Sequence, residues 1–124
     1  DALLQATFSK YESRIRKTLD AVTEKPSLVH GDLWKGNVVC GPSGRPYFID
    51  PAAYYGHREV DLAMSELFGG FGPEFYAAYR ERSPLATGYE TRRTIYNVYH
   101  LLNHWILFGE SYRAQVAQAF ASLG

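Results

Sequence analysis

The sequence has 124 residues, of which 46% are hydrophobic and 15% aromatic, and this is enough apolar material for the core of one domain. Thirteen basic residues balance thirteen acidic ones, so the composition argues against a nucleic-acid-binding face and against a basic membrane-surface patch. No stretch is long and apolar enough to cross a bilayer, and the first residues lack the layout of a signal peptide, so we expect a cytoplasmic protein.

The first predicted element is a helix over residues 1–25, which Pro26 ends. Apolar residues recur there every three to four positions with charged residues between them, as on one face of a helix. The apolar positions are Leu3, Leu4, Phe8, Tyr11, Ile15, Leu19 and Val22. Residues 27–29 then form a short extended segment that leads into His30.

The next predicted element is a β-hairpin that ends at Asp50. Its strands are the apolar runs 38–40 and 46–49, and the turn-rich residues 41–44 join them. Pairing about the middle of this turn predicts that Asn37 lies beside Asp50, across the spacing of about 5 Å between adjacent strands. Cys40 is the only cysteine and cannot form an internal disulfide, so we predict a small buried apolar group rather than a redox switch.

The rest of the chain is predicted to be helical. The expected helices cover residues 60–68, 73–82, 89–108 and 111–123, with glycines after the first and third. The fold class is therefore α+β, mainly α, with a small β-hairpin that carries the catalytic residues. We expect residues 1–124 to form a single domain.

The stretch from His30 to Asn37 fits the HxDxxxxN frame of a kinase catalytic loop. Phosphoryl transfer from ATP needs an acceptor-orienting carboxylate and oxygen ligands for Mg²⁺ around the terminal phosphate. Asp32, Asn37 and Asp50 supply these groups. A chance HxD before an ordinary hairpin is the alternative, but a second acid directly after a hydrophobic strand favours the kinase site.

The sequence also lacks the elements that cover the phosphates in kinases. It contains neither a GxGxxG nor a GxxxxGK motif, and no strand-borne lysine precedes residue 25. The chain opens with Asp1, and its sole methionine is the internal Met64. We therefore expect the carboxyl-terminal lobe of a longer protein, whose amino-terminal, ATP-cradling lobe is missing from these residues.

With Trp34 after Asp-Leu and Gly36 before the asparagine, residues 30–37 resemble the catalytic loop of the fructosamine kinase (ketosamine 3-kinase) family. This family is related to the aminoglycoside and choline phosphotransferases and has a protein-kinase-like fold. Residues 50–64, 67–71 and 96–104 are also similar to the family's pattern, so the resemblance covers most of the chain.

The resemblance implies that Asp32 is the catalytic base for a sugar hydroxyl and that Asn37 and Asp50 bind Mg²⁺. ATP would be the phosphoryl donor, and a small-molecule or protein-bound ketosamine phosphorylated at position 3 would be the product, in the service of protein deglycation. Trp34 occupies the place where protein kinases commonly carry lysine. The neighbouring Lys35 either reaches the transferred phosphate or is a solvated loop lysine.

Two further residues are assigned to the support of the catalytic loop. His30 is interpreted as a loop brace rather than a general base. Asp61, near the start of a predicted helix, is either a third metal ligand or a cap of backbone N–H groups. The resemblance to kinase-like proteins, in which an acid after the metal-binding aspartate braces the backbone of the catalytic loop, favours that bracing role for Asp61.

The candidate acceptor-binding residues are aromatic or histidine side chains. Trp34, Tyr54 and Tyr55 either stack on the sugar-amine or pack the loop against the helices. His100 and His104 have the spacing of a metal pair on one helix face, but no glutamate follows the first as in HExxH. They are better explained as the polar lining of a cleft or as core histidines.

Three functions follow from these observations. The first is a fructosamine kinase lobe, which we expect to be inactive alone. The second is a related phosphotransferase that acts on an aminoglycoside or on choline. The third is a non-catalytic module that binds a partner, including self-association through the apolar face that the missing lobe would cover.

Overall fold

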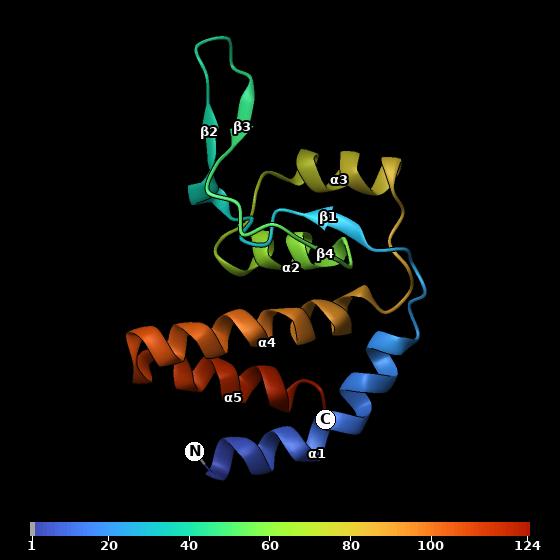
Figure 1. The fold of residues 1–124 in the computed structure, drawn as a ribbon, viewed down its shortest axis with the longest axis vertical. Helices are drawn as coiled ribbons and strands as arrows, with labels where there is room; N and C mark the ends of the chain where they lie inside the picture. Colours follow the sequence, from blue (N-terminus) through green and yellow to red (C-terminus); the bar gives the residue numbers. More distant parts are fainter. Residues whose placement is uncertain (1) are drawn as a thin grey trace. The chain divides into compact units, whose positions relative to one another are not determined.

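The computed structural model describes residues 2–124, with only the backbone of Leu3 and Leu4. It is a mostly helical α+β structure with small two-stranded sheets (Figure 1). The elements in chain order are α1 (Ala2–Asp20), β1 (Ser27–Val29), the 3-10 helix η1 (Lys35–Asn37), β2 (Val38–Cys40), β3 (Pro46–Phe48), β4 (Tyr54–Gly56), α2 (Glu59–Leu67), α3 (Pro73–Arg82), α4 (Tyr89–Phe108), the 3-10 helix η2 (Glu110–Tyr112) and α5 (Arg113–Ala121). They form two compact units, residues 24–87 and the segments on either side of them.

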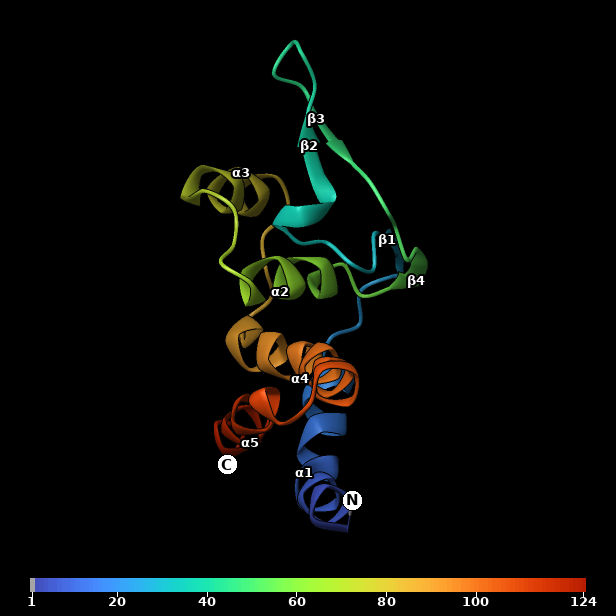
Figure 2. The same ribbon diagram turned by 90° about the vertical axis from the view of Figure 1, so that its left-hand side faces the viewer.

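The flanking segments form a helical unit in which α4 and α5 lie side by side and α1 contacts both (Figures 1 and 2). The rings of Tyr11 and Phe120 stack with their centroids 6.0 Å apart, and they join α1 to α5. The guanidinium of Arg14 donates a hydrogen bond to the carbonyl of Gly124 at 3.0 Å. The buried apolar residues of this unit are Tyr89, Ile95, Val98, Leu101, Val116, Phe120 and Leu123.

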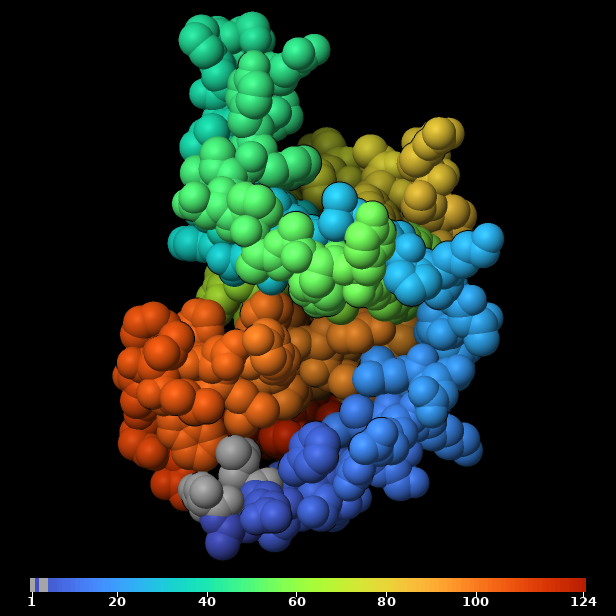
Figure 3. All heavy atoms as spheres, viewed as in Figure 1, coloured from blue at the N-terminus to red at the C-terminus, as the bar shows by residue number. Residues whose placement is uncertain are grey.

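Residues 24–87 form the unit that contains the predicted catalytic loop. Strand β1 pairs antiparallel with β4, and β2 pairs antiparallel with β3. The β2–β3 hairpin extends away from α2 and α3 in both ribbon views, and the space-filling view shows it as a projecting finger (Figures 1, 2 and 3). Helices α2 and α3 are joined by a hydrogen bond between Ser65 and the hydroxyl of Tyr76 at 3.1 Å.

Most predicted helices are found where the sequence places them. Those over residues 73–82 and 89–108 are confirmed to the residue, and α2 lies one residue earlier than predicted. The last helix differs in its first turn, because Glu110–Tyr112 is a 3-10 turn and α5 begins at Arg113. Strand β4 was not predicted: it is a three-residue segment ending in glycine, and it is defined by its pairing with β1.

The first helix is shorter than predicted, since α1 ends at Asp20 and not at residue 25. Val22 and Thr23 are β-branched and have lower helix propensity. Beyond the end of the helix, the carboxylate of Glu24 accepts a hydrogen bond from Arg58 at 2.7 Å, across 34 residues of sequence. Asp1, where the prediction began, lies outside the described residues, as do the side chains of Leu3 and Leu4.

The hairpin is confirmed but its predicted register is wrong by one residue. Gly41 donates to the carbonyl of Arg45 at 2.9 Å, and Gly44 donates to the carbonyl of Gly41 at 2.9 Å with a φ of 75°. These bonds form a three-residue loop with glycine in the left-handed region, and such a loop centres the hairpin on one residue instead of between two. Asn37 therefore lies opposite Ile49, whose N–H donates to its carbonyl at 3.0 Å, and Asp50 follows one residue later.

The prediction that Cys40 is buried is wrong, because the thiol side chain is exposed. Cys40 ends β2 on the projecting hairpin, where Val39, Tyr47 and Phe48 are exposed as well. A two-stranded ribbon has two faces, and no layer of residues 24–87 covers either of them at this point.

None of the helices within residues 2–124 combines the length and the apolar character that a membrane span requires.

Candidate active site

The predicted catalytic loop begins where β1 ends, at the buried Val29. The carbonyl of His30 accepts a hydrogen bond from the N–H of Ala52 at 2.9 Å, which ties the loop to the segment that follows Asp50. Gly31 has a φ of 83°, and a Cβ there would lie 2.1 Å from the carbonyl oxygen of Ala52. Only glycine fits this close approach of two backbone segments.

The carboxylate of Asp61 holds the backbone of this loop. Its two oxygens accept hydrogen bonds from the N–H groups of His30 at 2.7 Å and Gly31 at 2.9 Å. Asp61 lies in the first turn of α2, where the helix dipole favours a negative charge. Among the roles predicted for Asp61, this geometry is that of a backbone brace.

The imidazole of His30 connects Asp32 to the end of the hairpin. Its Nδ1 accepts the N–H of Asp32 at 3.2 Å, and its Nε2 lies 2.8 Å from the carbonyl oxygen of Ile49. Both bonds form at once when the ring is neutral with its proton on Nε2, because Nδ1 must then accept and Nε2 must donate. The ring of His30 thus contacts the backbone of both Asp32 and Ile49.

Asp32 and Asn37 are joined directly across the turn between them. The side-chain nitrogen of Asn37 donates to the carbonyl oxygen of Asp32 at 2.9 Å and to its carboxylate oxygen Oδ2 at 3.1 Å. Asn37 is 6% exposed. Among residues 2–124, no donor bonds to its amide oxygen.

Asp50 follows β3 and the paired Ile49, and its backbone is unusual. Its φ of 49° is the single positive value at a non-glycine position within residues 2–124. Its exposed carboxylate accepts no hydrogen bond from the described chain. The Asn37 amide oxygen and the Asp50 carboxylate are hard oxygen donors of the kind that Mg²⁺ prefers, so the chemistry of the two groups fits this ion.

Trp34 and Lys35 lie at the outer side of the loop. The indole of Trp34 covers Gly36, where a Cβ would lie 2.3 Å from the ring. It contacts Phe68 edge-on, with centroids 6.4 Å apart, and remains 38% exposed. Packing and acceptor stacking are therefore both compatible with its position. Lys35 begins η1, is exposed and pairs with no carboxylate among the described residues.

Tyr54 and Tyr55 lie on β4, beside β1. The ring of Tyr54 would contact a Cβ at Gly31 at 3.2 Å, so it lies next to the catalytic loop. Tyr55 pairs with Leu28 in the sheet and is 75% exposed. The structure brings Tyr54 to the predicted site, whereas the side chain of Tyr55 extends into solvent.

His100 and His104 lie on α4, in the other compact unit. The Nδ1 of His104 lies 2.7 Å from the carbonyl oxygen of His100, one helical turn earlier, and donates to it. Its ring also lies 5.1 Å from that of Tyr112 in η2. One nitrogen of His104 is thus occupied within its own helix.

Sequence reasoning missed a network centred on Arg58. Its guanidinium forms a bidentate pair with Glu24, at 2.7 and 3.0 Å, and lies over the ring of Tyr79. The hydrogen bond from Arg58 lowers the pKa of Glu24, and Glu24 in turn raises the pKa of Arg58. The sequence offered no signal for this pair, because 34 residues separate its members.

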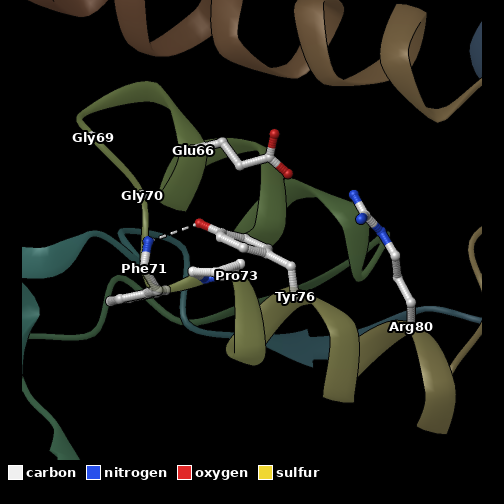
Figure 4. A pocket seen from close by; sticks show the side chains of 7 residues that line it. All are labelled: Glu66, Gly69, Gly70, Phe71, Pro73, Tyr76 and Arg80. Atoms are coloured by element: carbon white, nitrogen blue, oxygen red, sulfur yellow. Dashed lines mark hydrogen bonds between the residues drawn. The ribbon is translucent and has the colours of Figure 1, made fainter.

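Two recesses of about 440 Å³ each open within residues 24–87. One lies beside the catalytic loop and is mainly apolar, and its lining includes Leu28, Val29, Leu33, Phe48, Asp61, Leu62 and Phe75. The other lies between the end of α2 and α3 (Figure 4). There the hydroxyl of Tyr76 accepts the N–H of Phe71 at 3.0 Å, and Glu66 and Arg80 lie at the rim. None of the predicted site residues lines this second recess.

Comparisons with known proteins add an independent observation. A family model described as fructosamine kinase matches residues 2–123. The chain is 48% identical over 114 residues to a protein of Enterococcus faecium named "probable ketoamine kinase", with 92% of this chain and 41% of that protein covered. It is 50% identical over 88 residues to the ketosamine-3-kinase of Mus musculus, with 71% of this chain and 28% of that protein covered.

Solved structures give the same result. The crystal structure of a candidate fructosamine-3-kinase from Haemophilus somnus is similar with a TM-score of 0.80 and 35% identity, over 89% of this chain and 38% of that one. A candidate fructosamine-3-kinase from Thermobifida fusca gives a TM-score of 0.75 and 40% identity, over 88% of this chain and 40% of that one. The chain thus spans less than half the length of these relatives.

Proposed function

The chain belongs to the fructosamine kinase family, and from this membership we propose that it is the catalytic-loop lobe of an ATP-dependent ketosamine 3-kinase. The family match confirms the resemblance drawn from residues 30–37. The observation that supports the proposal most is the contact of Asn37 with both the carbonyl and the carboxylate of Asp32. This contact joins the proposed base to a proposed metal-binding residue in one turn.

In the proposed reaction, the oxygen of the sugar hydroxyl attacks the terminal phosphate of ATP while the carboxylate of Asp32 accepts the proton of that hydroxyl. The new P–O bond forms as the bond to ADP breaks. Asn37 and Asp50 are the residues that would hold Mg²⁺, which when bound neutralises phosphate charge. His30 and Asp61 hold the loop, and Lys35 is proposed to approach the transferred phosphate.

The proposed acceptor is a free or protein-bound ketosamine. Trp34 and Tyr54 are aromatic surfaces beside the loop on which a sugar-amine could stack, and Tyr55, His100 and His104 remain predictions for the acceptor site. Phosphorylation of the 3-hydroxyl would serve protein deglycation. A cytoplasmic location also remains a prediction.

The test is ATP-dependent phosphorylation of a fructosamine such as fructoselysine by the longer kinase that we propose contains this lobe. In that longer kinase, Asp32→Asn should abolish phosphoryl transfer, because the amide cannot accept the proton of the sugar hydroxyl. The binding of ATP should be nearly unchanged. Retained turnover in the variant would contradict the assignment of Asp32. Aminoglycosides and choline are tested as acceptors in the same assay. A strong preference for fructosamines is predicted only by the ketosamine kinase proposal and not by the alternative, a related phosphotransferase for aminoglycosides or choline.

We also propose that the 124-residue chain is inactive alone, since its sequence contains no glycine-rich loop to cover the phosphates. The same assay on the chain should detect no phosphorylation. Transfer that depends on Asp32 would show that the chain completes a site by itself or through self-association, and would contradict this proposal.

Self-association was predicted through the apolar face that the missing lobe would cover, and we propose the exposed apolar end of α4 as part of the surface that it uses. Ile106, Leu107 and Phe108 are 80%, 72% and 64% exposed, and consecutive apolar side chains of this size favour association. Sedimentation of the chain should show a concentration-dependent dimer that Ile106→Lys weakens. A strictly monomeric profile would contradict this proposal.

A further inference from the structure

The guanidinium of Arg58 uses every N–H group it has. Nε donates to Glu24 at 2.7 Å, and Nη2 donates to Glu24 at 3.0 Å and to the carbonyl of Pro84 at 2.7 Å. Nη1 donates to the carbonyl of Ser83 at 3.1 Å and to the hydroxyl of Tyr79 at 3.4 Å. A guanidinium has five N–H donors in a fixed plane, so all of them are engaged.

These acceptors lie in three separate segments of the unit. Glu24 precedes β1, Tyr79 is on α3, and Ser83 and Pro84 follow α3. Arg58 itself is the residue immediately before α2. One side chain therefore fixes the start of α2 against the segment that enters β1 and against the end of α3.

The start of α2 is also the element that holds the catalytic loop. Asp61 lies three positions after Arg58, and its carboxylate binds the N–H groups of His30 and Gly31, immediately before Asp32. The strand that Glu24 precedes, β1, leads directly into the same loop. Arg58 is thus connected to both elements that hold the loop, which are the start of α2 with Asp61 and the strand β1.

We propose that Arg58 is a positioning residue for Asp32, acting through Asp61 and β1 on the geometry of the catalytic loop. Its catalytic consequence rests on the proposed function; its effect on the loop does not. Surface pairs of arginine and glutamate elsewhere in the chain differ in kind, because their members lie only three or four positions apart. Examples are Arg16 with Glu12, Arg93 with Glu90 and Arg113 with Glu110.

Lysine at position 58 keeps the positive charge but lacks the planar guanidinium with its five N–H donors. Its single ammonium has three donors at one point and cannot reach acceptors on both sides of a planar group at once. Arg58→Lys should therefore retain contact with Glu24 and lose the carbonyls after α3. The matched control is Arg113→Lys, which removes an arginine with one ion pair and one aromatic contact, to Trp105, in the other unit.

The first readout is amide hydrogen exchange of the 124-residue chain. Arg58→Lys should lower the protection of the His30 and Gly31 amides by about tenfold or more relative to the amides of α4, because opening of the loop no longer requires breaking the Arg58 network. Arg113→Lys should leave both amides unchanged. Unchanged protection of His30 and Gly31 in a folded Arg58→Lys chain would overturn the proposal.

The second readout is the kinetics of ketosamine phosphorylation in the longer kinase. Misplacement of a catalytic group lowers kcat about tenfold to a hundredfold, and KM for ATP and ketosamine should stay within about twofold, because Arg58 contacts neither substrate in this proposal. A kcat equal to that of the parent would overturn the proposal. A parallel fall of kcat in Arg113→Lys would do the same, since the effect would then be general.

If Arg58→Lys does not fold, Tyr79→Phe removes a single acceptor of the network and should change the same exchange and kcat values in the same direction by a smaller factor. No change in either readout would overturn the proposal. If the parent kinase phosphorylates no ketosamine, the proposed function fails, whereas the exchange measurement still decides whether Arg58 holds the loop.

Discussion

The carboxylate of Asp61 accepts the backbone N–H of His30 at 2.7 Å, across 31 residues of sequence. The second oxygen of the same carboxylate accepts the N–H of Gly31, so one side chain fixes two consecutive peptide groups. A carboxylate is suited to this role because both of its oxygens are acceptors only. The orientation of the residue that follows, Asp32, therefore depends on a residue of α2.

Asp61→Asn is expected to destabilise the chain by about 1 to 3 kcal/mol, the range for a hydrogen-bond donor left without a partner inside a protein. The amide has one acceptor oxygen, so one of the two N–H groups would face an NH₂ group and lose its partner. Urea denaturation of the parent and the variant measures this difference.

The matched control is Asp20→Asn, which makes the same chemical change at an exposed position at the end of α1. Its effect should stay within about 0.5 kcal/mol, as for most surface substitutions. Equal unfolding free energies for Asp61→Asn and the parent would show that Asp61 does not hold the loop.

Gly31→Ala separates steric overlap from backbone strain when it is compared with Gly44→Ala. Both glycines have a positive φ, 83° and 75°, but a Cβ at Gly31 would lie 2.1 Å from the Ala52 oxygen, whereas a Cβ at Gly44 would meet nothing within 4 Å. Gly44→Ala should cost about 1 kcal/mol for the left-handed conformation, and Gly31→Ala at least about 3 kcal/mol. Thermal or urea unfolding measures the loss of unfolding free energy in each variant. Equal losses in the two variants would contradict the close approach of Gly31 to the carbonyl of Ala52.

Much of the secondary structure follows from local patterns. The helix over residues 73–82 was predictable because Pro73 is favoured in a first turn, and the helix over residues 89–108 because a long apolar face ends at Gly109. The hairpin was predictable from its turn residues, but its register was not, since Gly44 at a φ of 75° determines whether the loop has three or four residues. The register prediction for Asn37 and Asp50 failed for this reason.

The site was predictable in part. The HxDxxxxN spacing reflects a local turn, and in the structure Asn37 contacts Asp32 within that turn. Contacts across long separations leave no such pattern. The bidentate pair of Arg58 and Glu24 spans 34 residues, and a single sequence does not reveal such a tertiary partner.

Two substitutions of Asp50 are expected to differ in their effect on stability and to have the same effect on activity. At a φ of 49°, glycine carries no Cβ penalty, whereas alanine lacks the tolerance of aspartate for the left-handed region. Asp50→Gly should therefore be more stable than Asp50→Ala by about 1 kcal/mol, while both should lose ketosamine phosphorylation. Unfolding of the chain and turnover of the longer kinase are the two measurements. Full activity in either variant would exclude Asp50 from the proposed site.

The ion pair of Glu24 with Arg58 should make stability depend on pH in the acidic range. The hydrogen bond from Arg58 lowers the pKa of Glu24 below its ordinary value of 4.5. A group whose pKa is lower in the folded state binds protons more readily when unfolded, so its stabilising contribution is present above that ordinary value and is lost as the pH falls through the lowered pKa.

Glu24→Gln removes this titration while keeping the shape of the side chain. The parent should therefore be more stable than the variant near neutral pH, and the difference should shrink below pH 4.5. Urea denaturation across this range measures the difference, and Glu12→Gln, which removes the partner of the surface residue Arg16, is the control with little expected effect. A gap between parent and Glu24→Gln that stays constant as the pH falls would show that Glu24 is not held as a carboxylate by Arg58.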